Sequence, residues 1–235
     1  MMEKGVLRAA ATRSALFSQL PPAETSRLLD ASSLRQFPAG QALFHQGDVP
    51  EYLFQILSGL VRVTQLNSEG EQITLRIMRP GDLCCVAAFR QRSYPATATA
   101  IKATSVLAWR TNSFIALTQQ SPALADNVVC IAGDRTREML QRATEMTGKC
   151  IAQRIAASLL RLSAQAGVRT PAGIHIESPV TRIDLASMAG LTYFTVSRTL
   201  SAWQKQGLVK SGRHRLTILD ISRISEIAEP RIGAG

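Results

Sequence analysis

The sequence predicts an α+β fold in which one long helix joins an N-terminal antiparallel β-roll to a helical C-terminal domain that includes a β-hairpin. Short β-rich segments, separated by glycine and proline turns, fill most of the first half of the chain. A helical pattern follows from Pro122, and two capped helices separated by Gly190 lie near the C-terminus. A length of 235 residues suits two domains. We expect the parts to span residues 1–120, 121–148 and 149–235.

The first half has the pattern of a small antiparallel barrel or jelly roll, because short strands recur at nearly regular spacing. The expected strands are Ala42–His45, Tyr52–Leu57, Leu60–Leu66, Gln72–Met78, Leu83–Phe89, Ala96–Ile101 and Ser105–Trp109. Such a roll encloses either a ligand cavity or a packed core, and the pattern fits both. Before it, Ala15–Leu34 is expected to be partly helical, with a helix start at Pro21-Pro22 and with Leu28, Leu29 and Leu34 facing inward.

The segment Pro122–Thr147 is expected to form the connecting helix. Apolar residues recur along it at steps of three and four, as on a helix with one apolar face. Arg135 interrupts this face, so the pattern is that of an imperfect coiled coil. The apolar face can pack against the chain's own β-roll or pair with a second copy of the chain.

The segment Thr181–Leu219 has the pattern of two short helices with a tight turn between them. Thr181 and Asp184 have the spacing of a capping box, Gly190 ends the first helix, and Thr192 caps the second. The inner stripe of the second helix is Val196, Leu200 and Trp203. This arrangement is a helix-turn-helix, whose second helix enters the major groove of DNA.

A basic hairpin follows the second helix. Leu208–Lys210 and Arg215–Leu219 are expected to be strands joined at Ser211-Gly212-Arg213, which makes the hairpin the wing of a winged helix-turn-helix. Residues 1–147 carry 15 basic and 12 acidic side chains, a net charge of +3, whereas residues 148–235 carry 12 and 5, a net charge of +7. The excess positive charge lies in the part expected to face phosphates.

These patterns predict a protein that binds double-stranded DNA. The residues expected to contact bases are Thr192, Tyr193, Phe194, Thr195, Ser197 and Arg198. The residues expected to contact phosphates are Thr181, Arg182, Lys210, Arg213, His214 and Arg215. Helix-turn-helix proteins commonly bind two half-sites as dimers, so we favour a homodimer formed by the connecting helix. The residues expected in its interface are Leu124, Val128, Ile131 and Met139.

Three motifs give the chain a resemblance to the Crp/Fnr superfamily of bacterial transcription regulators. They are Gly40-Gln-Ala-Leu-Phe-His-Gln-Gly-Asp48, Pro80-Gly81-Asp82, and Asp184-Leu-Ala with Thr195-Val-Ser-Arg198 and Gly207-Leu-Val209. The resemblance implies a cyclic-nucleotide-binding-like roll, a DNA-binding regulator and, for an activator, RNA polymerase as a partner. The segments TVSRTLSAWQKQGLV and GRHRLTI are most similar to regulators of nitrogen-oxide metabolism.

The resemblance also suggests which signals to expect. Members that bind cyclic AMP hold its ribose with glutamate and its phosphate with an Arg-Ser pair, where this chain has Val86, Tyr94 and Pro95. A buried phosphate without a cation is strongly disfavoured, so cyclic AMP is not expected, although Arg90 and Arg92 lie nearby. Iron–sulfur members use cysteines near the N-terminus, and this chain has none before position 84.

Two sensing chemistries stay open. The nitrogen-oxide branch implies haem, for which His45 is the candidate axial ligand, with Cys84, Cys85 and Met78 as alternatives. An ordinary hydrogen-bonded histidine at the edge of the barrel is the other interpretation of His45. The second chemistry is thiol oxidation. The four thiols are Cys84, Cys85, Cys130 and Cys150.

The DNA-contacting face departs from close relatives, which often place Arg or Glu where this chain has Tyr193 and Phe194. These two side chains offer an apolar contact, to a thymine methyl for instance, and one hydroxyl, while Arg198 keeps the matching basic residue.

Nothing in the sequence favours an enzyme. The three histidines are scattered, and the chain has neither a glycine-rich phosphate loop nor a Gly-x-Ser-x-Gly motif. The alternatives are a regulator controlled by thiol oxidation or by its abundance alone, and a small-molecule-binding roll with an accessory basic domain. No apolar run approaches the ~18 residues of a membrane span, and charges interrupt the N-terminus, so a cytoplasmic protein is expected.

Overall fold

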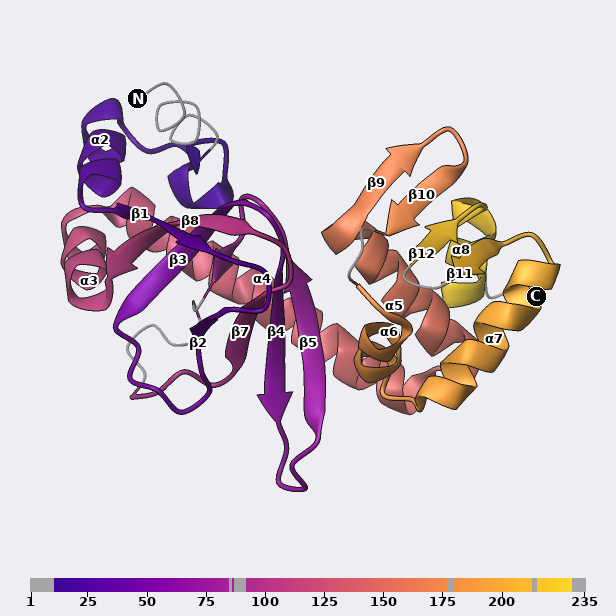
Figure 1. Cartoon of the computed structure of the whole chain (residues 1–235). Coiled ribbons are helices and arrows are strands. Elements are labelled where there is room, and N and C mark those ends of the chain that lie inside the picture. Colours follow the sequence, from indigo (N-terminus) through magenta and orange to yellow (C-terminus); the bar gives the residue numbers. More distant parts are fainter. Residues whose placement is uncertain (1–10, 85, 87–91, 177–179, 213–214, 230–235) are drawn as a thin grey trace. The chain divides into compact units, whose positions relative to one another are not determined.

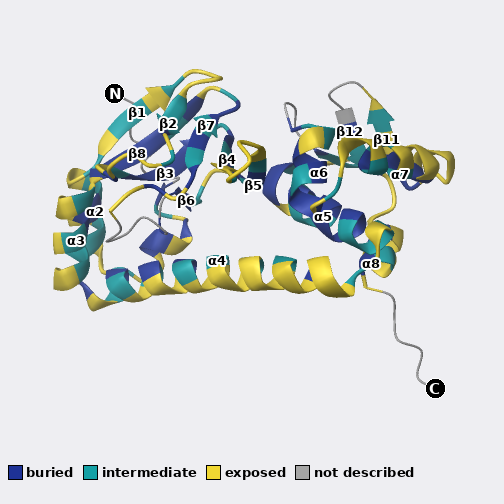
Figure 2. Ribbon diagram, turned by 90° about the horizontal axis from the view of Figure 1, so that it is seen from below, coloured by how far each residue is buried: buried dark blue, intermediate teal, exposed yellow. Residues whose placement is uncertain are grey.

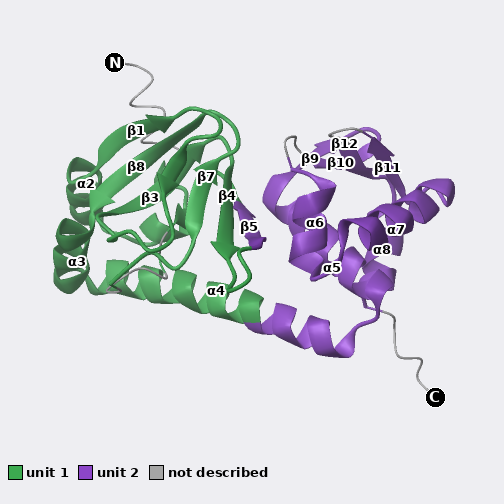
Figure 3. Ribbon diagram, turned by 60° about the horizontal axis from the view of Figure 1, so that its bottom comes forward, with its two compact units in different colours: residues 1–70, 78–139 green, residues 71–77, 140–235 purple. Residues whose placement is uncertain are grey.

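The structure is a computed structural model that describes residues 11–84, 86, 92–176, 180–212 and 215–229, with only the backbone at residue 215. The chain divides into two compact units (Figure 3). The first comprises residues 1–70 and 78–139, and the second comprises residues 71–77 and 140–235. None of the helices in the described part of the chain is long and apolar enough to span a membrane.

The N-terminal half forms the predicted β-roll (Figure 1). Its strands are β1 (Ser33–Phe37), β2 (Ala42–Phe44), β3 (Tyr52–Ser58), β4 (Val61–Leu66), β5 (Gln72–Met78), β6 (Leu83–Cys84), β7 (Thr97–Ala100) and β8 (Thr104–Arg110). They make two four-stranded sheets, β1-β8-β3-β6 and β2-β7-β4-β5, whose pairs β1–β8, β3–β8 and β4–β7 are antiparallel. The helical elements of this half are η1 (Ala15–Phe17), α2 (Pro22–Asp30), α3 (Thr111–Gln120) and α4 (Pro122–Gly148).

Two sequence expectations for this half can be compared with the structure. The helix expected at Pro21-Pro22 runs from Pro22 to Asp30, and Leu34, which lies in strand β1 opposite Leu107 of β8, packs against the core as expected. Of the strand expected over Leu83–Phe89, the described residues include β6, and residues 85 and 87–89 lie outside them.

Aromatic side chains fill the interior of the roll. The rings of Phe44 and Tyr94 stack with centroids 4.0 Å apart, and Phe44 also stacks on Phe54 at 6.1 Å. The hydroxyl of Tyr94 donates to the carbonyl of Tyr52 at 2.7 Å and accepts from its amide at 3.2 Å. Met78 and Cys84 belong to the same cluster. Of the two possibilities left open by the sequence, the described residues therefore form the packed core.

The first half of α4 packs into this unit, so the expected dimer seam needs correction. Leu124, Val128 and Ile131 are 2%, 5% and 8% exposed, in a cluster with Trp109 and Phe114. A helical apolar stripe shows that a face is buried but not by which chain, and here the roll buries it. In this structure these three residues therefore face the roll. Met139, also expected in the seam, is 68% exposed.

The second unit holds the remaining elements. They are α5 (Ile151–Ala166), β9 (Gly167–Thr170), β10 (Gly173–Ile176), α6 (Arg182–Ala189), α7 (Tyr193–Lys205), β11 (Val209–Gly212), β12 (Arg215–Ile218) and α8 (Ile221–Ala228). The strands form one sheet in the order β11-β12-β10-β9. The hairpin β9–β10 and helix α8 were not predicted, although the turn Pro171-Ala172-Gly173 between alternating residues signals such a hairpin.

Candidate nucleic-acid interface

The first helix of the helix-turn-helix, α6, begins at the predicted capping box. The Thr181 hydroxyl accepts from the Asp184 amide at 3.3 Å, and the Asp184 carboxylate accepts from the Thr181 amide at 2.8 Å. The helix ends at Gly190, which has the left-handed φ of 61° that favours glycine. Sequence and structure agree on both ends of this helix.

Arg154 of α5 holds the turn that follows α6. Its guanidinium donates to the carbonyl of Ala189 from Nε at 3.1 Å and from Nη2 at 2.7 Å, and to the carbonyl of Gly190 at 2.7 Å. A Cβ atom at position 190 would lie 2.8 Å from this guanidinium. Arg154 therefore stabilises the turn that orients α7. Sequence reasoning missed this residue because its partners are 35 and 36 residues away.

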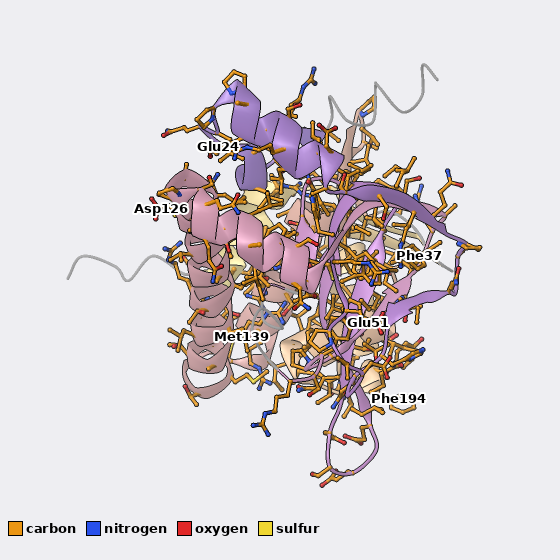
Figure 4. The ribbon with its side chains drawn as sticks, turned by 90° about the vertical axis from the view of Figure 1, so that its left-hand side faces the viewer. Glu24, Phe37, Glu51, Asp126, Met139 and Phe194 are labelled. Atoms are coloured by element: carbon orange, nitrogen blue, oxygen red, sulfur yellow. The ribbon has the colours of Figure 1, made fainter. Side chains whose placement is uncertain are left out.

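The second helix, α7, buries one face and exposes the other. Its buried residues are Val196, Leu200 and Trp203, as predicted. Its N-cap, Thr192, accepts from the amide of Thr195 at 3.3 Å. Tyr193 is 44% exposed, Phe194 is 81% exposed, and Arg198 is also exposed (Figure 4 labels Phe194). Of the side chains expected to contact bases, Thr192, Tyr193, Phe194 and Arg198 are exposed, and Thr195 and Ser197 are half-buried.

The side chain of Arg182, which was expected to contact phosphate, instead makes hydrogen bonds within the protein. Its Nε and Nη2 donate to the Ser211 hydroxyl at 3.1 and 2.8 Å, and its Nη1 donates to the Ser197 hydroxyl at 2.8 Å. Arg182 thereby joins α6 to α7 and to the wing strand β11. The hydroxyl of Ser197, which was expected to contact a base, accepts this internal hydrogen bond.

The wing is the antiparallel hairpin β11–β12, as predicted. A second link ties it to α7, because the Ser211 amide donates to Oε1 of Gln204 at 2.8 Å. Lys210 is exposed on β11 opposite Thr217. Of the other wing residues expected to contact phosphate, Arg213 and His214 lie outside the described residues, and at Arg215 only the backbone is described.

The β-roll does not fit a cyclic nucleotide in its described part. Where relatives hold the ribose and phosphate, Val86 lies in the core at 9% exposure and Tyr94 is 3% exposed in the aromatic stack. Pro95 and Arg92 are exposed, and Arg90 lies outside the described residues. A buried phosphate needs a cation or donor, and these buried positions offer an aliphatic side chain and a hydroxyl already bonded to the Tyr52 backbone.

The residues considered as haem ligands lie in different environments. His45 is exposed in the turn after β2, where its amide donates to the Asp48 carboxylate at 3.1 Å, while the neighbouring Phe44 enters the core. Met78 and Cys84 are buried among the aromatic rings. Within the described ranges, no three His, Cys, Asp or Glu side chains gather as metal ligands would.

The described cysteines are free thiols. Cys84 is buried, Cys130 and Cys150 are exposed, and Cys85 lies outside the described residues. Cys150 caps the start of α5, and its amide donates to the Gln153 side chain at 2.9 Å.

Two family models match the chain. The model of the cyclic nucleotide-binding domain matches residues 34–121, and that of the Crp-like helix-turn-helix domain matches residues 153–227. The cyclic AMP receptor protein of Thermus thermophilus is 29% identical over 216 residues, which are 92% of this chain and 97% of that protein. The transcriptional activator protein FnrA of Stutzerimonas stutzeri is 28% identical over 186 residues, which are 79% and 76% of the two chains.

Solved structures share this fold. A second Thermus thermophilus protein, a transcriptional regulator of the CRP/FNR family, superposes with a TM-score of 0.72 at 23% identity, over 85% of this chain and 100% of that one. FixK2 from Bradyrhizobium japonicum gives a TM-score of 0.73 at 22% identity, over 83% and 96%. These two likenesses concern the fold, and the family models and sequence relatives add the family. The chain belongs to the Crp/Fnr family of DNA-binding transcription regulators.

Proposed function

We propose that this protein regulates transcription as a homodimer in which α7 of each copy enters the major groove at one operator half-site. The observation that carries the proposal is the exposed first two turns of α7, with Phe194 81% exposed, in a half of the chain with a net charge of +7. Two recognition helices about 34–36 Å apart can then meet two half-sites one helical turn apart. Because its ligand is DNA, we place the protein in the cytoplasm.

A different face of α4 is proposed for the dimer. The apolar residues Val129, Met139 and Met146 are 69%, 68% and 48% exposed (Figure 2 colours exposed residues along this helix). Positions 129, 132, 136, 139, 143 and 146 follow the alternating steps of three and four of a coiled-coil seam. Most of this stripe is exposed, and Ala132 at its edge packs in part against the core of the roll. The small exposed residue Ala143 allows two helices to approach closely.

Helix α4 is also proposed to couple the roll to the DNA-binding unit. Its first half contributes Val128 and Ile131 to the core of the roll. Near its end, the buried Glu145 accepts from Arg161 of α5 at 2.6 Å. A change in the roll that moves α4 would therefore alter both the dimer seam and the anchoring of α5.

The packed interior of the roll favours a regulator controlled by thiol oxidation or by its abundance over one that binds a nucleotide or haem inside the roll. The nitrogen-oxide branch, to which the α7 segment is similar, stays a prediction, since the relatives reported above do not single it out. FnrA is named a transcriptional activator. If this chain activates as well, RNA polymerase is its partner.

Selection of binding sites from random DNA tests the proposal. Full-length protein should enrich a two-fold symmetric motif whose half-site centres lie about 10 base pairs apart. Fluorescence anisotropy should then give an affinity for this operator at least about 10³ times that for scrambled DNA, and sedimentation should give two copies per duplex. Enrichment of no motif, with one affinity for all sequences, would refute the proposal.

A further inference from the structure

Two aromatic side chains lie at the N-terminal end of the exposed face of α7. The rings of Tyr193 and Phe194 pack edge to face, with centroids 5.8 Å apart and an interplanar angle of 78°. Neither belongs to the stripe that holds α7 in its unit, which is Val196, Leu200 and Trp203. An apolar surface is thus presented at the end of the helix expected to approach base edges first.

The polar side chains beside this pair are engaged within the protein. The Thr192 hydroxyl accepts from the Thr195 amide and lies 3.0 Å from the Thr195 hydroxyl. The Ser197 hydroxyl accepts from Arg182. Arg198, one turn after Phe194, makes no side-chain hydrogen bond or ion pair with another described residue. The groups that remain available to contact DNA on these two turns are therefore an aromatic surface, the hydroxyl of Tyr193 and the guanidinium of Arg198.

We propose that the Tyr193–Phe194 pair binds the C5-methyl group of a pyrimidine, so that each half-site requires thymine or 5-methylcytosine at one position. In the major groove this methyl is the apolar group that a base pair presents, and it distinguishes thymine from the amino donor of cytosine. A phenyl ring provides no acceptor for that amino group but contacts a methyl group well. The inference rests on the proposed function and adds the class of base that the operator must contain.

The same pair would make binding depend on cytosine methylation. Burial of one methyl group corresponds to about a fourfold change in affinity. A symmetric operator with two half-sites should therefore show roughly a fifteenfold change when both methyl groups are removed. Arg198 should bind a guanine within the same half-site, since it lies on the same face of α7.

Base analogues that change only the methyl group test the proposal in full-length protein. Each thymine of the selected operator is replaced in turn by deoxyuridine, and affinity is measured by anisotropy. We expect about a fourfold loss at one position per half-site. At that position a C·G pair should bind more weakly than T·A, and 5-methylcytosine should recover about fourfold over cytosine.

Variants at position 194 assign the effect to this side chain. Phe194→Ala should bind the thymine and deoxyuridine operators equally, whereas the matched control Phe194→Leu should keep part of the difference. Circular dichroism should show that both variants unfold as the wild type does, because position 194 is exposed.

The possible failures are distinguishable. Equal wild-type affinity for thymine and deoxyuridine at every position would overturn the methyl contact while leaving the regulator proposal standing. An unchanged thymine preference in Phe194→Ala would overturn the proposed contact by Phe194. Equal binding of operator and scrambled DNA would instead refute the proposed function itself.

Discussion

The aromatic residues of the β-roll and those of α7 have opposite environments. In the roll, Phe44, Phe54 and Tyr94 stack in a closed core, with Tyr94 only 3% exposed. On α7, Tyr193 and Phe194 face solvent. The roll matches a family model named for cyclic-nucleotide binding, yet the space between its sheets holds the protein's own side chains. A shared fold therefore does not by itself establish a shared ligand, and function has to be argued from each site.

This contrast implies that the two regions should respond differently to substitution. Removal of a buried ring leaves a cavity and a lost hydrogen bond, whereas removal of an exposed ring leaves only solvent. The first change should affect stability, and the second should affect recognition. Substitutions in the roll, in α4 and in α7 test this distinction, and the largest effect is expected for a buried ring.

Tyr94→Ala should destabilise the roll by about 3–5 kcal/mol, because it removes a stacked ring and the hydroxyl that bonds both polar groups of the Tyr52 backbone. Phe194→Ala is the matched control and should change stability by less than about 0.5 kcal/mol. The two tryptophans lie one in each unit, so urea unfolding in a Trp203→Phe background lets Trp109 report on the roll alone. A loss below about 1 kcal/mol for Tyr94→Ala would mean that the interior is not packed as described.

The two faces of α4 give the second test. Met139→Glu places a charge in the proposed seam and should weaken the dimer by about 2–4 kcal/mol, giving folded monomers at micromolar concentration. Val128→Glu, on the face that the roll buries, should instead unfold the first unit. Sedimentation and circular dichroism separate the outcomes. A wild-type monomer, or a Met139→Glu dimer of unchanged affinity, would contradict the proposed seam.

Recognition by α7 gives the third test. Arg198→Ala should cost about 1–3 kcal/mol on the operator and relax the preference at one base pair per half-site, because a guanidinium can bind guanine O6 and N7 together. Isotherms on the operator and on scrambled DNA provide the comparison. An equal loss on both DNAs would make Arg198 a backbone contact and leave base contacts to the aromatic pair.

The sequence predicted best those features that depend on neighbouring residues. The capping box of Thr181 and Asp184, the left-handed turn at Gly190 and the buried stripe of α7 all involve residues a few positions apart. Such contacts form within one helix, so the spacing of residue types determines them. The α+β architecture with a roll, a long helix and a helix-turn-helix domain was also confirmed.

The features that the sequence did not predict depend on distant partners. Val128 was assigned to a dimer because a coiled-coil spacing does not say which surface covers it. Arg182 was assigned to phosphate because its partner Ser211 is 29 residues away. Whether the roll is hollow depends on how Phe44 and Tyr94, 50 positions apart, meet in space. In each case the sequence indicated what kind of residue was present but not which distant residue it contacts.

The last and smallest expected effect concerns Arg182, whose guanidinium joins α7 to the wing. A phosphate contact releases counterions, so its loss should lower the salt dependence of binding by ~1 in the logarithmic slope. Loss of a hydrogen bond within the protein should leave this slope unchanged. We expect Arg182→Ala to weaken operator binding about fivefold, roughly 1 kcal/mol, with an unchanged slope, because α7 and the wing lose hydrogen bonds that orient them.

Lys210→Ala is the control for this experiment, since it removes an exposed cation from the neighbouring strand position. It should weaken operator and scrambled DNA alike and lower the slope by ~1. Isotherms at several salt concentrations give both slopes. A reduced slope for Arg182→Ala would mean that the guanidinium leaves Ser197 and Ser211 to bind phosphate in the complex, which would return Arg182 to the role expected from the sequence and free the Ser197 hydroxyl for a base.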